Sequence, residues 1–300
     1  MDFVQYYKIL ASDEEYDNVI EVDNERLTSV KHKGDLMAQL QESFMLYQSV
    51  LFNVYNLQKC VILYADDTVE LTENCPTEMQ DTAIVINALM SNILSSARTL
   101  TDKMQTVMKK YYDGNTFLKA MADVYDSSYS YRLAQGLRNM CQHGFCVVSQ
   151  CNGRYGLDLY QLIFVKDFTV NGSFKKTLDD LVEKLSKYSC APMYSLSALI
   201  SEYTTDVLHL YLLFLGEIRP TIEELELQLK SFVTQNPESL NHKNHELLGY
   251  LLISDGMFLH AVPTKESLLK TIDYYIQDVK KQLALFEIAE ADVKNEFVKV

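Results

Sequence analysis

The sequence predicts a mainly α-helical α+β protein, in which an antiparallel helical bundle is followed by a β-hairpin and a mixed C-terminal region. Up to His143 the apolar residues recur at steps of three and four, which is the spacing of one helix face. After Gly144 this spacing changes, and an Asn-Gly dipeptide separates two β-rich runs. With 300 residues, of which 48% are hydrophobic, the chain can bury a substantial core.

The first two predicted helices are long and cover about 34–63 and about 78–111, with Pro76 and Thr77 suited to the start of the second. Two such amphipathic helices, joined by a moderate loop, are expected to pack antiparallel at a bundle crossing angle. Residues 1–33 are mixed and charged, and they are predicted to form an N-terminal extension with VIEV as a short strand.

Two shorter helices are predicted next. Asp-Gly-Asn at 113–115 is expected to end the second long helix. The run FLKAMADVY then forms a third helix, and SSYSYRLAQGLRNMCQH forms a fourth, with Ser127 or Ser128 as its N-cap. Gly144 follows His143 directly and suits the left-handed residue that ends a helix.

A hairpin is predicted where FCVVSQ and LDLYQLIF flank CNGRYG. A further helix is expected from about Ser173, and Pro192 interrupts the helical pattern after it. The segment 34–190 is therefore predicted to be one helical domain with a trailing hairpin.

The C-terminal region, residues 191–300, is expected to combine helices with a second hairpin. Its predicted elements are a helix at about 194–215, the linker GEIRP, a helix from Thr221, a hairpin turning at Asp255-Gly256, and a helix at about 265–289 before a fraying polar tail.

The charge distribution separates one segment from the rest of the chain. The formal net charge is −14, which makes the surface as a whole unsuited to coat nucleic acid. Between Asp126 and Asp158, however, the sequence has no carboxylate. The residues of this segment that can carry a positive charge are Arg132, Arg138, His143 and Arg154. Burial alone does not explain three arginines in a segment without acids.

The six cysteines form no Cys-x-x-Cys pair and no cluster with metal-ligand spacing, so no metal site and no cofactor are expected. His242 and His245 are expected to be surface loop residues. The start MDFVQYYKILASDEEYD lacks the charge and shape of a signal peptide, and no apolar run approaches the ~20 residues of a membrane-spanning helix. A cytoplasmic protein with reduced thiols and without membrane association is expected.

The end of the fourth helix gathers polar groups that suit an anion. Asn139 and His143 are four residues apart and share a helix face. Arg138 lies about 140° round the helix from His143, and its long side chain can reach that face. An arginine fork matches phosphate geometry, and a helix C-terminus favours a protonated histidine.

The run Arg138-Asn139-Met140-Cys141-Gln142-His143 resembles the R-polar-x-x-x-H motif of the HEPN superfamily. These all-helical domains act on nucleotides and RNA and are common in prokaryotic toxin and antiviral systems. The glycine directly after the histidine, and the two long helices before a shorter motif helix, are also similar to that family. The likeness covers about residues 34–145.

The resemblance implies a homodimeric, metal-independent endoribonuclease in a toxin or antiviral defence role, with two arginines and two histidines in one composite site. RNA carries its own nucleophile, the 2′-hydroxyl, and a histidine with an ordinary pKa near ~6.5 transfers protons at neutral pH. By position, Arg138 would hold the phosphate, His143 would transfer protons and Asn139 would orient the phosphate or His143. The residues expected to contact the RNA substrate are Arg132, Arg154 and Gln142.

Alternatives to this function stay open. Arg138 and His143 can instead cap the helix and pair with carboxylates of neighbouring helices. A domain of this kind can also be a non-catalytic module that binds a nucleotide, RNA or a protein partner. An antitoxin or other regulatory partner is a further expectation. Phe145 stands where a subset of the family has a tyrosine that a nucleotide-transferring antitoxin modifies, so that mode of control is not expected.

Other residues near the motif have simpler explanations. The basic residues Arg98, Lys103, Lys109 and Lys110 fit a solvated helix face better than a phosphate-tracking surface. The tyrosines Tyr125, Tyr129 and Tyr131 fit a core or interface better than base stacking. Cys141 is excluded as a thiol partner of His143, because positions two apart on a helix point away from each other.

Overall fold

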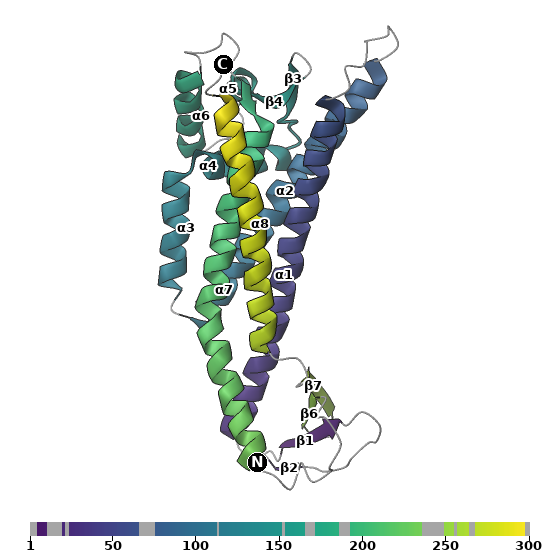
Figure 1. Cartoon of the computed structure of the whole chain (residues 1–300), viewed down its shortest axis with the longest axis vertical. Coiled ribbons are helices and arrows are strands. Elements are labelled where there is room, and N and C mark those ends of the chain that lie inside the picture. Colours follow the sequence, from purple (N-terminus) through teal and green to yellow (C-terminus); the bar gives the residue numbers. More distant parts are fainter. Residues whose placement is uncertain are drawn as a thin grey trace. The chain divides into compact units, whose positions relative to one another are not determined.

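The computed structural model (Figure 1) describes residues 5–10, 20–21, 24–65, 76–112, 114–151, 154–165, 172–185, 193–235, 249–254, 257–263 and 268–297. Its long helices and antiparallel hairpins confirm the predicted mainly helical fold. The chain divides into two compact units: residues 1–44 with 214–278, and residues 45–213 with 279–300. Each unit draws on both halves of the sequence, and the domain limits after residues 33 and 190 stay a prediction.

The first two helices are α1, Asn24–Ala65, and α2, Pro76–Tyr111. The start of α2 agrees with the prediction, whereas α1 begins well before the predicted residue 34. Gly34 is buried inside α1, because the charged residues before it are good helix formers even though they lack an apolar period. In Figure 1, α2 runs in the opposite direction to α1, as predicted.

Helix α3, Asn115–Ser127, and helix α4, Tyr129–Gln142, confirm the next two predictions. Gly114 has a φ of 68°, a left-handed conformation that glycine adopts without strain, and it separates α3 from α2. Ser128 is the N-cap of α4, because its hydroxyl accepts a hydrogen bond from the backbone N–H of Tyr131 at 3.1 Å.

The first predicted hairpin is confirmed in part. Strand β3, Ser149–Cys151, pairs antiparallel with β4, Arg154–Asp158, and β5, Met193–Ser195, adds a third strand on the other side of β4. The prediction of a strand beyond Asp158 is wrong, because Leu159–Val165 is helix α5.

The reason for this helix lies in its first turn. The Asp158 carboxylate accepts a hydrogen bond from the backbone N–H of Gln161 at 3.0 Å, as an N-cap does. Leu159 and Leu162, three residues apart, are both buried. This spacing fits a helix face, and the β-prone composition of the segment concealed it.

Helix α7, Leu196–Gln235, is continuous, so the predicted linker GEIRP is wrong. Pro220 lies inside it and has no N–H to donate to the carbonyl of Gly216. Both residues are exposed, so water can serve that carbonyl. Ile218 and Ile222, on either side of the proline, are fully buried, and their burial offsets part of the ~3 kcal/mol helix cost of proline.

The second predicted hairpin is confirmed. Strand β6, Gly249–Ser254, pairs antiparallel with β7, Met257–Pro263, on either side of residues 255–256. Strand β1, Gln5–Leu10, was not predicted and lies between β6 and β2, Ile20–Glu21, which falls within VIEV. The sheet order is therefore β2-β1-β6-β7.

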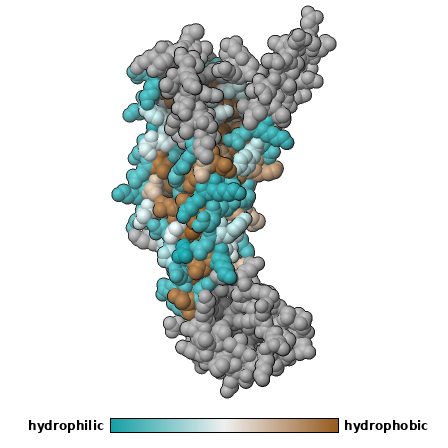
Figure 2. All heavy atoms as spheres, in the orientation of Figure 1, coloured by the Kyte–Doolittle hydropathy of each residue, from teal (hydrophilic) through white to brown (hydrophobic). Residues whose placement is uncertain are grey.

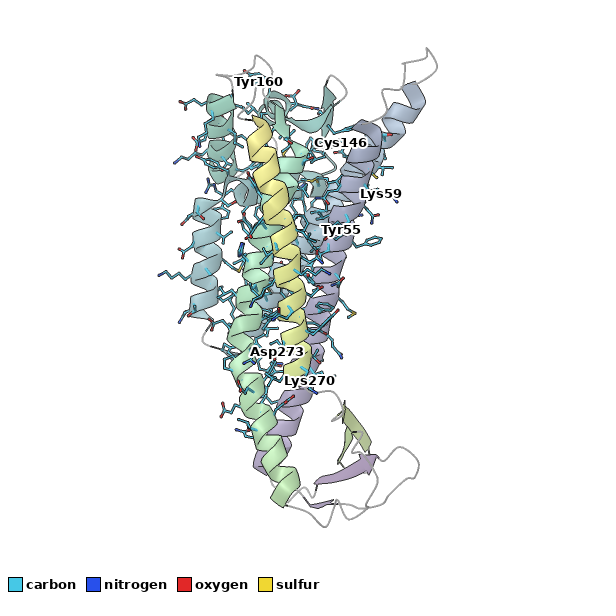
Figure 3. The ribbon with its side chains drawn as sticks, in the orientation of Figure 1. Tyr55, Lys59, Cys146, Tyr160, Lys270 and Asp273 are labelled. Atoms are coloured by element: carbon cyan, nitrogen blue, oxygen red, sulfur yellow. The ribbon has the colours of Figure 1, made fainter. Side chains whose placement is uncertain are left out.

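The last helix, α8, Leu268–Phe297, continues past residue 289, so the predicted fraying of the tail there is wrong. Helix α6, Gly172–Leu185, begins as predicted. Aromatic contacts join α1 to α7 and α8 in the second unit. Tyr47 stacks on Tyr211 with ring centroids 5.0 Å apart, and Tyr55 stacks on Phe286 at 6.2 Å. Tyr55, labelled in Figure 3, also donates a hydrogen bond from its hydroxyl to Gln282.

By length and composition alone, Thr82–Tyr111 within α2 is the one stretch of the described residues apolar enough to cross a membrane, and 33% of its window is buried. A core helix meets the same criterion, and α2 buries a row of apolar side chains that includes Ile86, Met90 and Ile93. Figure 2 shows hydrophobic residues interspersed with hydrophilic ones along the helices.

Candidate functional site

Helix α4 divides the motif between a buried face and an exposed one. Leu133, Leu137 and Met140 are fully buried, at the spacing that the sequence predicted. On the other side, Asn139 and His143 are exposed. The apolar face anchors the helix, and its polar end faces solvent.

The end of α4 has the hydrogen bonds of a Schellman motif. The N–H of Phe145 donates to the carbonyl of Met140 at 3.2 Å, and the N–H of Gly144 donates to Cys141 at 3.0 Å. Gly144 has a φ of 82°, which confirms the predicted left-handed residue. His143 is the C-cap, and its imidazole has no hydrogen bond or ion pair with any residue that the structure describes.

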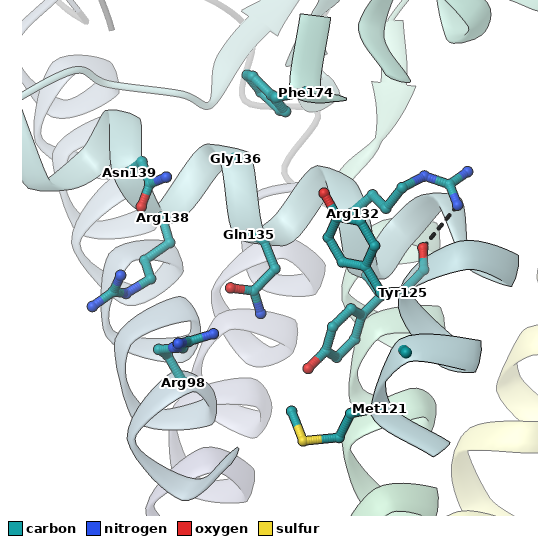
Figure 4. Close-up of a pocket in the computed structure, with 11 residues that line it drawn as sticks. Arg98, Met121, Tyr125, Arg132, Gln135, Gly136, Arg138, Asn139 and Phe174 are labelled. Carbon is teal, nitrogen blue, oxygen red and sulfur yellow. Dashed lines mark hydrogen bonds between the residues drawn. The ribbon is translucent and has the colours of Figure 1, made fainter. Parts of the chain in front are cut away.

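A cavity of about 370 Å³ opens on the flank of α4, within the second unit. Arg98 of α2, Tyr125 of α3 and Phe174 of α6 contribute to its lining. From α4 itself come Arg132, Gln135, Gly136, Arg138 and Asn139, among others. Figure 4 shows Arg98, Gln135, Arg138 and Asn139 gathered on one side of the cavity and Arg132 and Tyr125 on the other.

The three arginines of the cavity differ in what they bind. Arg98 forms a salt bridge with Asp102 at 2.9 Å, and a second nitrogen donates to the same carboxylate at 3.0 Å. Arg132 donates to the carbonyl of Tyr125 at 2.8 Å and lies 4.6 Å from the ring centroid of Tyr129. Arg138 makes no hydrogen bond or ion pair with any residue that the structure describes, and its Nε is buried.

The structure thus brings only part of the predicted site together. Arg132, Arg138 and Asn139 share the cavity, whereas Gln142 and His143 are exposed and do not line it. The side chain of Arg154 lies outside the described residues. Arg132 is held by two backbone carbonyls, so its position is determined by α3 as well as by α4.

The tyrosines near the motif have separate environments. Burial raises the pKa of Tyr131 to about 12, although the nearby Arg98 lowers it. Tyr131 packs against Tyr203, whose pKa is also raised by burial, with ring centroids 5.7 Å apart. Tyr131 is therefore a neutral core residue, as the sequence indicated, while Tyr125 is half-buried and lines the cavity.

Asn87 of α2 holds the chain that leaves the motif, and sequence reasoning missed it. Its side-chain oxygen accepts hydrogen bonds from the N–H groups of Val147 and Val148, both at 2.9 Å. Its amide nitrogen donates to the carbonyl of Val148 and to that of Ala83, both at 3.0 Å. An asparagine inside an amphipathic helix carries no local signal of such long-range pairing.

Replacing Asn87 with alanine is expected to lower the free energy of unfolding by about 2–3 kcal/mol, because three backbone groups of the buried residues Val147 and Val148 lose their partner. Thermal unfolding measures the change. Asn56→Ala is the matched control, since Asn56 donates only within α1, to Phe52. Equal effects of the two substitutions would contradict the role of Asn87.

Cys141 and Cys146 both lie near the end of α4, and both are free thiols (Figure 3 labels Cys146). Burial raises the pKa of Cys141 to about 11, so its thiol stays protonated at neutral pH. We expect Cys141 to react slowly with iodoacetamide at pH 7.5, as measured by mass spectrometry of the labelled peptides. Rapid labelling of Cys141 under native conditions would show that its thiol is more accessible and more acidic.

Among the described residues, no group of three or more His, Cys, Asp or Glu side chains could hold a metal ion. His242 and His245 lie outside these residues. Comparison of the chain with family models, with curated proteins and with solved structures gives no significant match in any of the three.

Proposed function

We propose that the chain is a metal-independent endoribonuclease of HEPN type, acting in toxin or antiviral defence. The observation that supports this most is the exposed, unpaired His143 at the tip of the same helix that carries Arg138. The alternative is that Arg138 and His143 both pair with carboxylates. Among the residues that the structure describes, neither side chain forms an ion pair.

In the proposed reaction the RNA 2′-oxygen attacks the adjacent phosphorus, and the bond to the 5′-oxygen breaks. The products are a 2′,3′-cyclic phosphate and a 5′-hydroxyl. His143 transfers a proton, either from the attacking 2′-hydroxyl or to the leaving 5′-oxygen. Arg138 stabilises the charge on the phosphoryl oxygens, and Asn139 orients the phosphate or His143.

A single helix tip supplies one histidine, whereas the attack and the departure of the leaving group require a base and an acid. A second copy of the chain, with its own Arg138 and His143 facing the same phosphodiester, would supply the other group. Exposed Asn139, Gln142 and His143 leave this surface open for such a homodimer. A regulatory partner or antitoxin would act by covering the same tip.

The test is cleavage of a mixed set of RNAs by the purified chain in EDTA. We expect cleavage of RNA but not of DNA, products with cyclic phosphate ends, and loss of activity in Arg138→Ala and His143→Ala. Cleavage that needs added Mg²⁺, or that survives both substitutions, would contradict the proposal. Size-exclusion chromatography with light scattering measures the expected dimer.

A second candidate function is a non-catalytic module that binds a nucleotide or RNA. One observation favours it: His143 does not line the cavity that contains Arg138 and Asn139. A dimeric wild-type protein that binds RNA and yields no products would support this function instead.

A further inference from the structure

The cavity beside α4 is strongly biased in charge. Three arginines, Arg98, Arg132 and Arg138, line it, and among the described residues no Asp or Glu does. A cavity with such an excess of positive charge is unusual in a protein with a net charge of −14. Guanidinium groups donate hydrogen bonds and accept none, so the cavity suits an anion with several acceptor oxygens, such as a phosphate.

Arg138 carries an unsatisfied donor. Its Nε is buried and has no hydrogen-bond partner among the described residues, whereas buried polar groups in folded proteins nearly always have one. In Figure 4, Arg98 and Arg138 come from neighbouring helices and lie on the same side of the cavity. An oxyanion between them would accept a hydrogen bond from the unpaired Nε–H of Arg138. It would also be a second negative charge near Arg98, which already pairs with Asp102.

The remaining walls are suited to a flat ring. Tyr125 supplies aromatic surface, and Met121 supplies a polarisable thioether. Gln135 and Asn139 supply amides that can both donate and accept hydrogen bonds. Aromatic side chains beside positively charged groups are the combination by which proteins hold single nucleotides, the ring by stacking and the phosphate by charge.

The size of the cavity limits the ligand. A volume of about 370 Å³ lies at the lower end of the ~300–1,000 Å³ range of small-molecule sites. This is suited to one nucleotide unit rather than to several. Arg138 and His143 are separated by about 7.5 Å along the helix axis, so a nucleotide in the cavity would place an adjoining phosphodiester toward the helix tip. A guanidinium has several N–H donors, so the buried Nε of Arg138 would bind the phosphate in the cavity and its terminal nitrogens would contact the adjoining phosphodiester.

We infer that this cavity is a binding subsite for a single nucleotide unit, with its phosphate between Arg98 and Arg138 and its base against Tyr125. The inference deepens the proposed function, because it supplies a nucleotide subsite beside the cleavage centre. Binding, however, does not require cleavage and can be measured without it. The nucleotide can be a free mononucleotide or one residue of a bound RNA strand.

Isothermal titration of the full chain separates these sources. The probes are AMP, adenosine, inorganic phosphate and a 2′-O-methyl RNA tetranucleotide, which has no free 2′-hydroxyl and cannot be cleaved by the proposed route. We expect AMP or the tetranucleotide to bind at least about tenfold more tightly than adenosine and phosphate. Tight binding of AMP identifies a free nucleotide as ligand, and tight binding of the tetranucleotide alone identifies an RNA residue.

The variants Arg98→Gln and Lys109→Gln each remove one positive charge from α2. Lys109 is exposed and does not line the cavity. We expect Arg98→Gln to lower the affinity for the tighter-binding probe about tenfold or more. Lys109→Gln is expected to change that affinity less than about twofold. Equal weakening by both variants, or binding of phosphate as tight as that of the tighter nucleotide probe, would overturn the inference.

Failure of this inference is distinguishable from failure of the proposed function. If RNA is cleaved through His143 while neither AMP nor the tetranucleotide binds at millimolar concentration, the subsite is refuted and the nuclease remains. If the nucleotide probes bind through Arg98 and no RNA is cleaved, the subsite remains and the nuclease is refuted. Thermal unfolding of Arg98→Gln shows whether its loss of binding comes from loss of folded protein.

Discussion

If the proposed ribonuclease function holds, replacing His143 with alanine is expected to slow RNA cleavage by about 100-fold or more, which is the usual contribution of a general acid or base. The side chain is exposed and has no partner among the described residues, so its removal leaves packing intact. The free energy of unfolding is expected to change by less than about 0.5 kcal/mol. Single-turnover cleavage of a labelled RNA measures the rate, and thermal unfolding measures the stability.

His209→Ala is the matched control for this substitution. His209 of α7 is also exposed, and its Nε2 lies 3.6 Å from a carboxylate oxygen of Glu287 on α8. We expect His209→Ala to cleave RNA at the wild-type rate. Full activity of His143→Ala would remove the chemical basis of the nuclease. Equal loss in both histidine variants would indicate a general effect on the fold.

A substitution at Arg138 tests whether its positive charge is sufficient or whether the planar geometry of its guanidinium is also required. Arg138→Lys keeps the positive charge but loses the planar fork that binds two phosphate oxygens together. We therefore expect Arg138→Lys to recover only a small part of the activity that Arg138→Ala loses. Full recovery by lysine would indicate that charge alone is sufficient.

Replacing Gly136 with alanine is expected to destabilise the protein by about 1–3 kcal/mol through overpacking. A Cβ at this position would lie 1.9 Å from Cδ2 of Phe174 and 2.2 Å from its Cε2, far inside van der Waals contact. Gly136 is buried in α4 and Phe174 is buried in α6, so neither side can easily give way. At about 2–4 °C per kcal/mol for a chain of this size or somewhat smaller, the melting temperature should fall by several degrees.

Gly216→Ala is the control with the opposite sign. Gly216 lies in α7 and is exposed, and a Cβ there would meet no atom within 4 Å. Alanine is expected to stabilise this position by about 0.4–1 kcal/mol, because it restricts the unfolded chain. The double variant Gly136→Ala/Phe174→Leu should recover part of the lost stability, since the smaller side chain makes room. A stabilising Gly136→Ala would show that α4 and α6 do not pack this closely.

The helices with a strong apolar period could be predicted from sequence because their folding signals are local. The apolar residues of α2 recur at helical spacing along the helix itself. Ser128 and Gly144 lie directly at the start and the end of α4, the helix that they delimit. The second hairpin was predicted for the same reason, from a turn dipeptide between β-rich runs. Sequence also singled out Arg138, Asn139 and His143 as one polar helix end.

Elements that depend on distant partners could not be predicted this way. Strand β1 forms only because β6, more than two hundred residues later, supplies its hydrogen bonds. Helix α7 continues through Pro220 because buried side chains on both sides hold it. Helix α5 needed the cap of Asp158, which outweighs the β propensity of the residues that follow.

In the candidate site, too, some features follow from local sequence and others depend on distant parts of the chain. The sequence by itself determined that an arginine, an asparagine and a histidine end one amphipathic helix, because helical periodicity and a terminal glycine place them there. Only the tertiary structure decided that Arg138 faces a cavity together with Arg98, while His143 remains outside in solvent. The physical reason is that a cavity is formed by the packing of α2, α3, α4 and α6, and side-chain packing between helices depends on contacts that no short stretch of sequence encodes.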